Sequence, residues 1–230
     1  MADEFLTVTI TDSIPVAEGQ TLLRLAAPLS VLVAHTAPGQ YVKVRRGDAK
    51  PAYIVLANTP GSTVLELLIK EASPLTAELR TLPAGETIEI SAPLGKGFPT
   101  DSAPGRDVFF LAAGTGIAAI RPVLQTMLLD RERYGTLHVL YGERTPEHFA
   151  FMDEWGRWQD SGVHCYRCVS RDEAMTTECL AGYVQDVLRK LGPSCGNAVG
   201  YLGGMEPMLV ACREAFAELG GDPAQLFTNF

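Results

Sequence analysis

An uncharged apolar run, Val108–Ala113, leads into the glycine turn Gly114-Thr115-Gly116 and restricts the possible folds more than any other segment. A helical pattern follows from Ile117 to about Asp130. A strand, a turn of the form G-x-G-x-x-A and a helix together favour a dinucleotide site over a turn that only joins two elements. We expect a side chain placed at Gly116 to block the dinucleotide and leave the fold intact.

Strand and helix patterns continue to alternate along the chain. Strands are predicted at 136–141, 163–169, 198–202 and 225–230, and helices at 146–159, 183–191 and 206–219. This alternation predicts a doubly wound parallel α/β sheet over residues 107–230. A second glycine turn, Gly203-Gly204-Met205, follows the strand 198–202. Both turns are therefore expected at the carboxyl edge of the sheet, where ligands bind in this architecture.

The strand 136–141 runs into Tyr141-Gly142-Glu143-Arg144. An acidic side chain at this place can accept a hydrogen bond from a ribose hydroxyl and repel a 2′-phosphate, which favours NAD. Arg144 beside it has the opposite preference. The cofactor is thus predicted as NAD or NADP, with NAD slightly favoured.

Residues 1–100 show a different pattern, with short strand segments and no alternating helices. Six short segments rich in Val, Ile, Leu, Thr and Tyr are separated by Gly and Pro residues: 5–11, 20–26, 40–45, 52–58, 64–71 and 86–92. This spacing predicts an antiparallel β-barrel, with a short helix from Pro74 to Leu82 before the last strand. The stretch Pro99–Arg106 is the natural linker, and a length of 230 residues fits two domains.

Composition excludes several classes of function. The net charge of −8 and the scattered Lys and Arg residues argue against a nucleic-acid partner. The apolar stretches are too short to span a membrane, and the acidic start is not a signal peptide, so a cytoplasmic protein is expected. Cys165 and Cys168 lie three apart on a predicted strand and therefore point to opposite faces, which favours packing thiols over a metal site.

The order of these motifs resembles the ferredoxin–NAD(P)H reductase superfamily. The motifs that carry the resemblance are the barrel, 110–117, 140–144, 182–184 and 203–208. The closest branch is the compact FAD/NAD(P)-binding oxidoreductases, which include electron-transfer subunits of dihydroorotate dehydrogenase. The resemblance implies a FAD-binding barrel at 1–100, an NAD(P)-binding domain at 107–230, and electron transfer from NAD(P)H through FAD. Because an iron–sulfur spacing is absent, the electron acceptor is expected to be external, and a separate protein is one candidate.

The resemblance also implies flavin contacts on the segment from Lys50 to Leu56. In one register Tyr53 packs on the isoalloxazine and Lys50 replaces an arginine that holds pyrophosphate. In the other register Ile54 takes the tyrosine position. In both, the backbone of Tyr53, Ile54, Val55 and Leu56 faces the ring. The family's serine is missing, so the alternative function is a dinucleotide-binding regulatory module that has lost flavin.

Further flavin contacts are implied after this segment. Leu68, Ile69 and Lys70 would meet the ribityl chain, and Leu75 and Thr76 would lie at a phosphate site at the start of the short helix. The alternative is that Ser73 and Thr76 only cap this helix. Phe230 would shield the flavin or simply pack at the end of the last strand. Hydride transfer compels no side chain to act as acid or base, so no catalytic residue is predicted.

Overall fold

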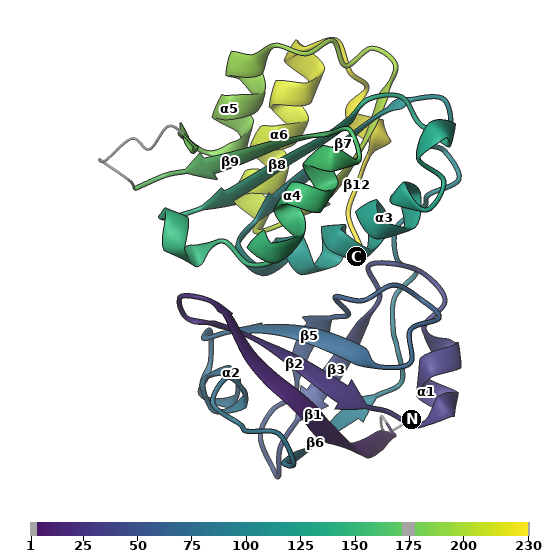
Figure 1. The fold of residues 1–230 in the computed structure, drawn as a ribbon, viewed down its shortest axis with the longest axis vertical. Helices are drawn as coiled ribbons and strands as arrows, with labels where there is room; N and C mark the ends of the chain where they lie inside the picture. Colours follow the sequence, from purple (N-terminus) through teal and green to yellow (C-terminus); the bar gives the residue numbers. More distant parts are fainter. Residues whose placement is uncertain (1–3, 172–177, 230) are drawn as a thin grey trace.

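The computed structural model describes residues 4–171 and 178–229, and it shows two halves stacked on one another (Figure 1). The N-terminal half is a six-stranded antiparallel sheet in the order β4-β3-β6-β1-β2-β5. Its elements are β1 (Phe5–Ala17), β2 (Gln20–Ala26), α1 (Leu29–Ala34), β3 (Tyr41–Arg45), β4 (Ala52–Val55), β5 (Leu65–Lys70), α2 (Pro74–Leu79) and β6 (Thr87–Ser91). A bridge between Leu56 and Leu67 joins the two edge strands and closes the barrel.

The barrel forms because its strands alternate between a buried and an exposed face. Val8 and Ile10 on β1, Val42 and Val44 on β3, and Ile88 on β6 all point into its core. Strand β1 is longer than predicted, since its second half continues to pair with β2 as far as Ala17. The helix α1 is not predicted from the sequence.

The C-terminal half is a six-stranded sheet in the order β10-β9-β8-β7-β11-β12, with parallel pairing between neighbours. Its strands are β7 (Asp107–Ala113), β8 (Leu137–Glu143), β9 (Val163–Val169), β10 (Leu180–Ala181), β11 (Ala198–Gly203) and β12 (Leu226–Phe227). Its helices are α3 (Ile117–Leu128), α4 (Met152–Asp160), α5 (Val184–Leu191) and α6 (Glu206–Glu218), with short 3₁₀ turns η1 (Gly114–Gly116), η2 (Arg131–Arg133), η3 (Pro146–His148) and η4 (Pro223–Gln225). This confirms the predicted doubly wound α/β fold.

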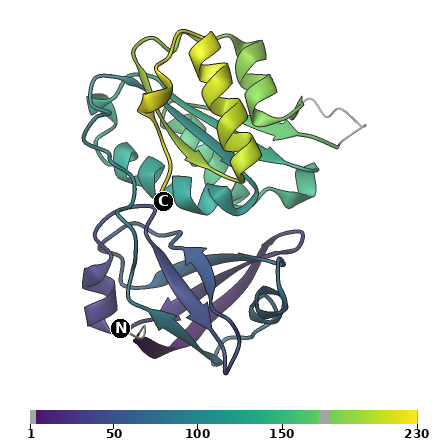
Figure 2. The ribbon, with the colours of Figure 1, turned by 180° about the vertical axis from the view of Figure 1, so that it is seen from behind.

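Helices cover both faces of this sheet (Figure 2). Val123 of α3 and Trp155 of α4 belong to one apolar cluster, whereas Val187 of α5 and Phe216 of α6 belong to another. The first cluster also contains Leu22, Ala57 and Leu68 of the barrel, so the interior is continuous between the two halves.

The predicted helix 146–159 is wrong in its first turns. Only a 3₁₀ turn forms at Pro146–His148, and Phe151 has a left-handed backbone with φ of 61°. That conformation cannot continue a right-handed helix, so α4 begins at Met152. Among the described residues, no helix is long and apolar enough to cross a membrane.

Candidate functional site

The two glycine turns meet at the carboxyl edge of the α/β sheet. Strands β7 and β11 are neighbours in register, with Gly203 opposite Ala112. A Cβ atom on Gly116 would lie 2.1 Å from the carbonyl oxygen of Gly203, and one on Gly203 would lie 2.3 Å from that of Gly116. The two backbones are therefore in direct contact, which only glycine permits.

Gly114 differs from Gly116 in its surroundings. Its φ is 58°, and a Cβ atom there would meet no described atom within 4 Å. Thr115 is half-buried, while the side chain of Ile117 belongs to the core. Across the edge, Gly204 is half-buried and Met205 is 78% exposed. The open space beside Gly114 fits the close approach of a pyrophosphate that a glycine turn permits.

Glu143 at the end of β8 lies in a buried polar cluster. Its side chain is 3% exposed, and Oε2 lies 3.4 Å from Nζ of Lys70. Oε1 accepts hydrogen bonds from Gln20 at 2.9 Å and from the Tyr141 hydroxyl at 3.3 Å. The carboxylate is thus already occupied by contacts to β2 and β5 of the barrel. The predicted ribose contact did not take these partners into account. Arg144 next to it is exposed, and Gly142 is half-buried.

The Tyr141 hydroxyl is fully enclosed by this cluster. It accepts a hydrogen bond from the Ala150 backbone. Burial, and then the charge of Glu143, raise the pKa of Tyr141 well above its usual value. The phenol is therefore a structural hydrogen-bond donor throughout the physiological pH range.

On the barrel, Tyr53 of β4 presents its ring on the outer surface. It is 65% exposed, and its ring centroid lies 5.7 Å from that of Tyr41 on β3. Ile54 and Leu56 point into the barrel core. Tyr53 is therefore the ring available to a flavin, as the first of the two registers requires. Lys50 is exposed and Val55 half-buried.

The start of α2 is capped by its own side chains. The Ser73 hydroxyl accepts from the Thr76 backbone N–H, and Thr76 Oγ1 accepts from the N–H groups of Ala72 and Ser73. The capping alternative is thus present in the structure. The side chains of Leu68, Ile69 and Leu75 are buried, so only their backbones remain for a ligand.

The described end of the chain lies on the barrel. Asn229 is buried, and its Nδ2 donates to the carbonyl oxygen of Gly39 at 2.9 Å. A Cβ on Gly95 would lie 2.9 Å from the Tyr41 ring and 3.7 Å from the Asn229 carbonyl oxygen, so the chain end lies near the Tyr41–Tyr53 surface. Phe230 lies outside the described residues.

The cysteine pair of β9 is divided between the two faces of the sheet. Cys165 packs with the cluster of α3 and α4, and Cys168 with that of α5 and α6. Burial raises the pKa of Cys165 to about 12, so its thiol stays protonated and unreactive. These positions agree with packing thiols.

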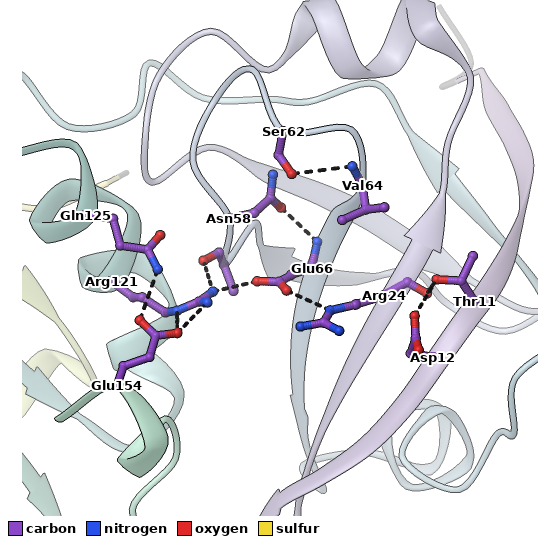
Figure 3. A network of polar contacts seen from close by, with 11 residues as sticks. Thr11, Asp12, Arg24, Asn58, Ser62, Val64, Glu66, Arg121, Gln125 and Glu154 are labelled. Atoms are coloured by element: carbon purple, nitrogen blue, oxygen red, sulfur yellow. Dashed lines mark hydrogen bonds and ion pairs between the residues drawn. The ribbon is translucent and has the colours of Figure 1, made fainter. Parts of the chain in front are cut away.

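A charged cluster that sequence reasoning missed joins the two halves. Arg121 of α3 contacts Glu66 of β5 and Glu154 of α4 (Figure 3). The feature of the sequence that could have revealed this cluster is an arginine between Ile120 and Val123, on the apolar face of the predicted helix. Its partners are 55 and 33 residues away in the sequence, so the pairing itself has no local pattern.

Comparison with known proteins agrees with this geometry. Residues 110–214 match the model of the oxidoreductase NAD-binding domain family. The chain is 26% identical over 197 residues to sulfhydrogenase 1 subunit gamma from Pyrococcus furiosus, covering 84% of this chain and 67% of that protein. It spans 40% of the length of sulfhydrogenase 2 subunit gamma from the same organism, which is 31% identical over 117 residues.

Solved structures share the whole fold. A ferredoxin NADP+ reductase from Neisseria gonorrhoeae with bound FAD and NADP superimposes with a TM-score of 0.84 at 16% identity, covering 97% of each chain. The cytochrome b5 reductase domain of Ulva prolifera nitrate reductase gives 0.81 at 16% identity, covering 98% of this chain and 97% of that one.

The fold and the paired glycine turns define a class, the two-domain reductases that use NAD(P)H and FAD. Within that class, the chain shares the fold of the ferredoxin–NAD(P)H reductase superfamily, and its similarity to a sulfhydrogenase gamma subunit supports the compact branch.

Proposed function

We propose that this chain binds FAD on residues 1–100 and NAD(P)H on residues 107–230, and passes electrons from the nucleotide through the flavin to a separate acceptor. The observation that carries the proposal is the place of η1, which contacts β11 of the α/β sheet and β5 of the barrel. The nucleotide turn therefore lies against a strand of the half that holds the exposed Tyr53. Clefts between domains are preferred sites for cofactors.

Each half supplies a defined set of groups. The backbones of 114–116 and 203–204 hold the dinucleotide, and Tyr53 packs on the isoalloxazine while the backbone of 53–56 faces its edge. Lys50 is exposed and is the lysine that holds the pyrophosphate. Lys70 already forms an ion pair with Glu143, which reduces the positive charge that it offers to a phosphate. When bound, FAD and the nicotinamide supply the redox chemistry by hydride transfer, and the protein supplies position and electrostatics.

We propose NADH as the preferred donor, because the negative charge of Glu143 at the end of β8 disfavours a 2′-phosphate nearby, although its oxygens already contact Gln20, Tyr141 and Lys70. The neighbouring Arg144 is exposed and is the group that favours a 2′-phosphate. Comparing kcat/KM for NADH and NADPH, in the wild type and in Arg144→Ala, tests this choice. A preference for NADPH that Arg144→Ala abolishes would overturn it.

We propose that the electron acceptor, which takes electrons from the reduced flavin, is a separate protein. The sulfhydrogenase relatives are named as subunits, so they work within larger assemblies. Affinity purification of the intact chain from its source, followed by electron transfer from NADH to the recovered partner, tests this. Equal rates with small quinones or oxygen and with the partner would contradict it.

Flavin binding is tested directly by titrating the purified protein with FAD and adding NADH without oxygen. We expect FAD uptake and bleaching of the flavin by NADH. Tyr53→Ala should weaken FAD binding, while Tyr183→Ala, which removes a ring of similar exposure from the α/β half, should not. A protein that binds NAD(P)H but takes up no FAD would instead favour the regulatory module.

A further inference from the structure

Arg121 occupies the boundary between the two halves of the molecule. It lies on α3 a little more than one turn after η1, and it is 8% exposed. Its guanidinium donates to the Ala57 carbonyl oxygen at 2.8 Å, to the Glu66 carboxylate, and to Glu154 Oε1 at 2.8 Å from Nε (Figure 3). We call Ala57, Glu66, Arg121 and Glu154 the Arg121 cluster.

On the barrel side, the cluster reaches the place where β4 and β5 close the barrel. The Leu56–Leu67 bridge is adjacent, and the Ala57 N–H donates to the Glu66 carbonyl oxygen at 2.8 Å. The Glu66 N–H in turn donates to Asn58 Oδ1 at 2.8 Å. Arg121 therefore contacts the backbone just after the strand segment proposed to face the flavin.

On the other side, the cluster is fixed by α4 and the residue before it. The centroid of the Phe151 ring lies 4.5 Å from the guanidinium carbon of Arg121. Phe151 holds a left-handed backbone, which is unfavourable for an aromatic residue and indicates that its position is imposed by the surroundings. Gln125 donates to the second carboxylate oxygen of Glu154 at 3.0 Å.

Stability alone does not account for this arrangement. Burial favours the neutral form of Glu66, but Arg121 and then Arg24 outweigh it and hold the pKa of that carboxyl below its usual range. Buried ion pairs are often no more stabilising than well-packed apolar side chains of the same volume. A guanidinium differs from an apolar side chain, and from an ammonium, in its planar array of donors with fixed directions.

We propose that Arg121 is a positioning residue that fixes the nucleotide turn relative to the flavin strand, by tying the helix that η1 opens to the junction of β4 and β5. The inference rests on the proposed function, because positioning concerns hydride transfer between the two cofactors. Misplacing reacting groups by about 1 Å costs on the order of 100-fold in rate. The cluster should therefore affect the transfer step more than the binding of either cofactor.

The test uses Arg121→Lys, which keeps one buried positive charge between two carboxylates but cannot span all the acceptors. We expect anaerobic reduction of bound FAD by NADH to slow by at least about tenfold. FAD and NADH dissociation constants should stay within about threefold of the wild type, since the cofactor contacts are elsewhere. Glu66→Gln, which keeps the side-chain shape, should show the same pattern to a smaller extent.

A second readout does not need the flavin. In the protein without cofactors, amide hydrogen exchange in the segments 57–66 and 114–116 should become faster in Arg121→Lys, because their mutual anchor is weakened. The control is Arg45→Lys, which alters a bidentate pair with Glu89 between β3 and β6 of the barrel and should change neither readout.

The outcomes separate the two proposals. If the wild type takes up no FAD, the proposed function fails and hydrogen exchange alone decides the role of Arg121. Unchanged exchange and an unchanged reduction rate in Arg121→Lys would overturn the inference. So would parallel losses of melting temperature and of both affinities, because these indicate a residue that only holds the fold.

Discussion

On the α/β side of the candidate site, two glycine backbones touch with no side chain between them, whereas the corresponding groups on the barrel side are side chains that already have partners. Gly116 and Gly203 are in contact through main-chain atoms. Thr76 completes the capping box of α2 with Ser73, and Lys70 pairs with Glu143. Where two backbones touch, as at Gly116 and Gly203, no atom can be added, whereas a paired side chain can lose a group and its surroundings can adjust. The two sides should therefore respond differently to substitution.

The largest effect is expected from an added methyl group between the two turns. Gly203→Ala places Cβ 2.3 Å from the Gly116 carbonyl oxygen, so the two turns must separate. We expect a loss of at least about 3 kcal/mol in the free energy of unfolding, measured with urea. The same contact corrects the expectation that a side chain at Gly116 leaves folding intact.

The control for this substitution is Gly156→Ala in α4, where a Cβ would meet no described atom within 4 Å. It should stabilise the protein by up to about 1 kcal/mol, because alanine favours a helix interior. Equal stabilities of Gly203→Ala and the wild type would show that the turns are not in contact.

A smaller effect, on binding alone, is expected at Gly114. Asparagine tolerates the left-handed backbone found there, and its side chain would enter the open space beside the turn. We expect Gly114→Asn to weaken NAD(P)H binding by at least about tenfold, or 1.4 kcal/mol, with FAD affinity unchanged. Gly105→Asn is the control, since Gly105 also has a positive φ and open space but lies in the linker. Equal NAD(P)H affinities in both variants would place the dinucleotide elsewhere.

On the barrel side, small effects on stability and on FAD binding are expected from Thr76→Ala. Thr76 is the N3 partner of the Ser73 capping box, so losing its hydroxyl should cost up to about 1 kcal/mol of stability. FAD binding should weaken by less than about tenfold, since only one hydroxyl is lost. Asp222→Ala removes a cap on η4 in the α/β half and should lower stability without any change in FAD affinity. A loss of FAD affinity much greater than tenfold would instead indicate that Thr76 contacts the FAD phosphate.

The smallest expected difference between the two halves is in the stability that each loses at acidic pH. Burial, and then the charge of His164, lower the pKa of His138 from 6.5 to about 4. Between these values the unfolded chain takes up a proton that the folded chain excludes, so stability falls as pH drops and levels off below about 4. His138→Phe keeps the stacking on Phe109 and should reduce the drop in melting temperature between neutral and acidic pH.

The matched variant on the barrel side is His35→Gln. Burial lowers the pKa of His35, but a backbone hydrogen bond with Ala37 opposes that shift. Its effect on the acid-induced drop should therefore be smaller than that of His138→Phe. A larger effect for His35→Gln would show that the barrel limits stability in acid.

Elements with local signals were predictable from the sequence. The parallel α/β order, the barrel and the strand–glycine–helix unit follow from hydrophobic periodicity and from turn residues that lie together in the chain. The bounds of β2 and β9 agree with the prediction. The cofactor contacts named from the resemblance stay predictions.

Features that depend on distant residues were not predictable. Gln20 meets Glu143 across 123 residues, and this pairing decides whether the carboxylate is available to a ribose. The left-handed Phe151, which shortens α4, is explained by its packing on Arg121 and not by its own preference. Packing between segments far apart in the sequence, and not local propensity, determined these features.

The hydrogen bond from Asn229 to Gly39 spans 190 residues and has a consequence for biosynthesis. A chain emerging from the ribosome can pair the barrel strands early, but the loop around Gly39 must wait for residue 229. The first half to be made is thus completed by residues near the end of the second. Such long-range closures slow folding and leave surface exposed to aggregation in the meantime. Nascent chains stalled before residue 229 should therefore carry a barrel that proteases cut more readily near Gly39 than in the released protein.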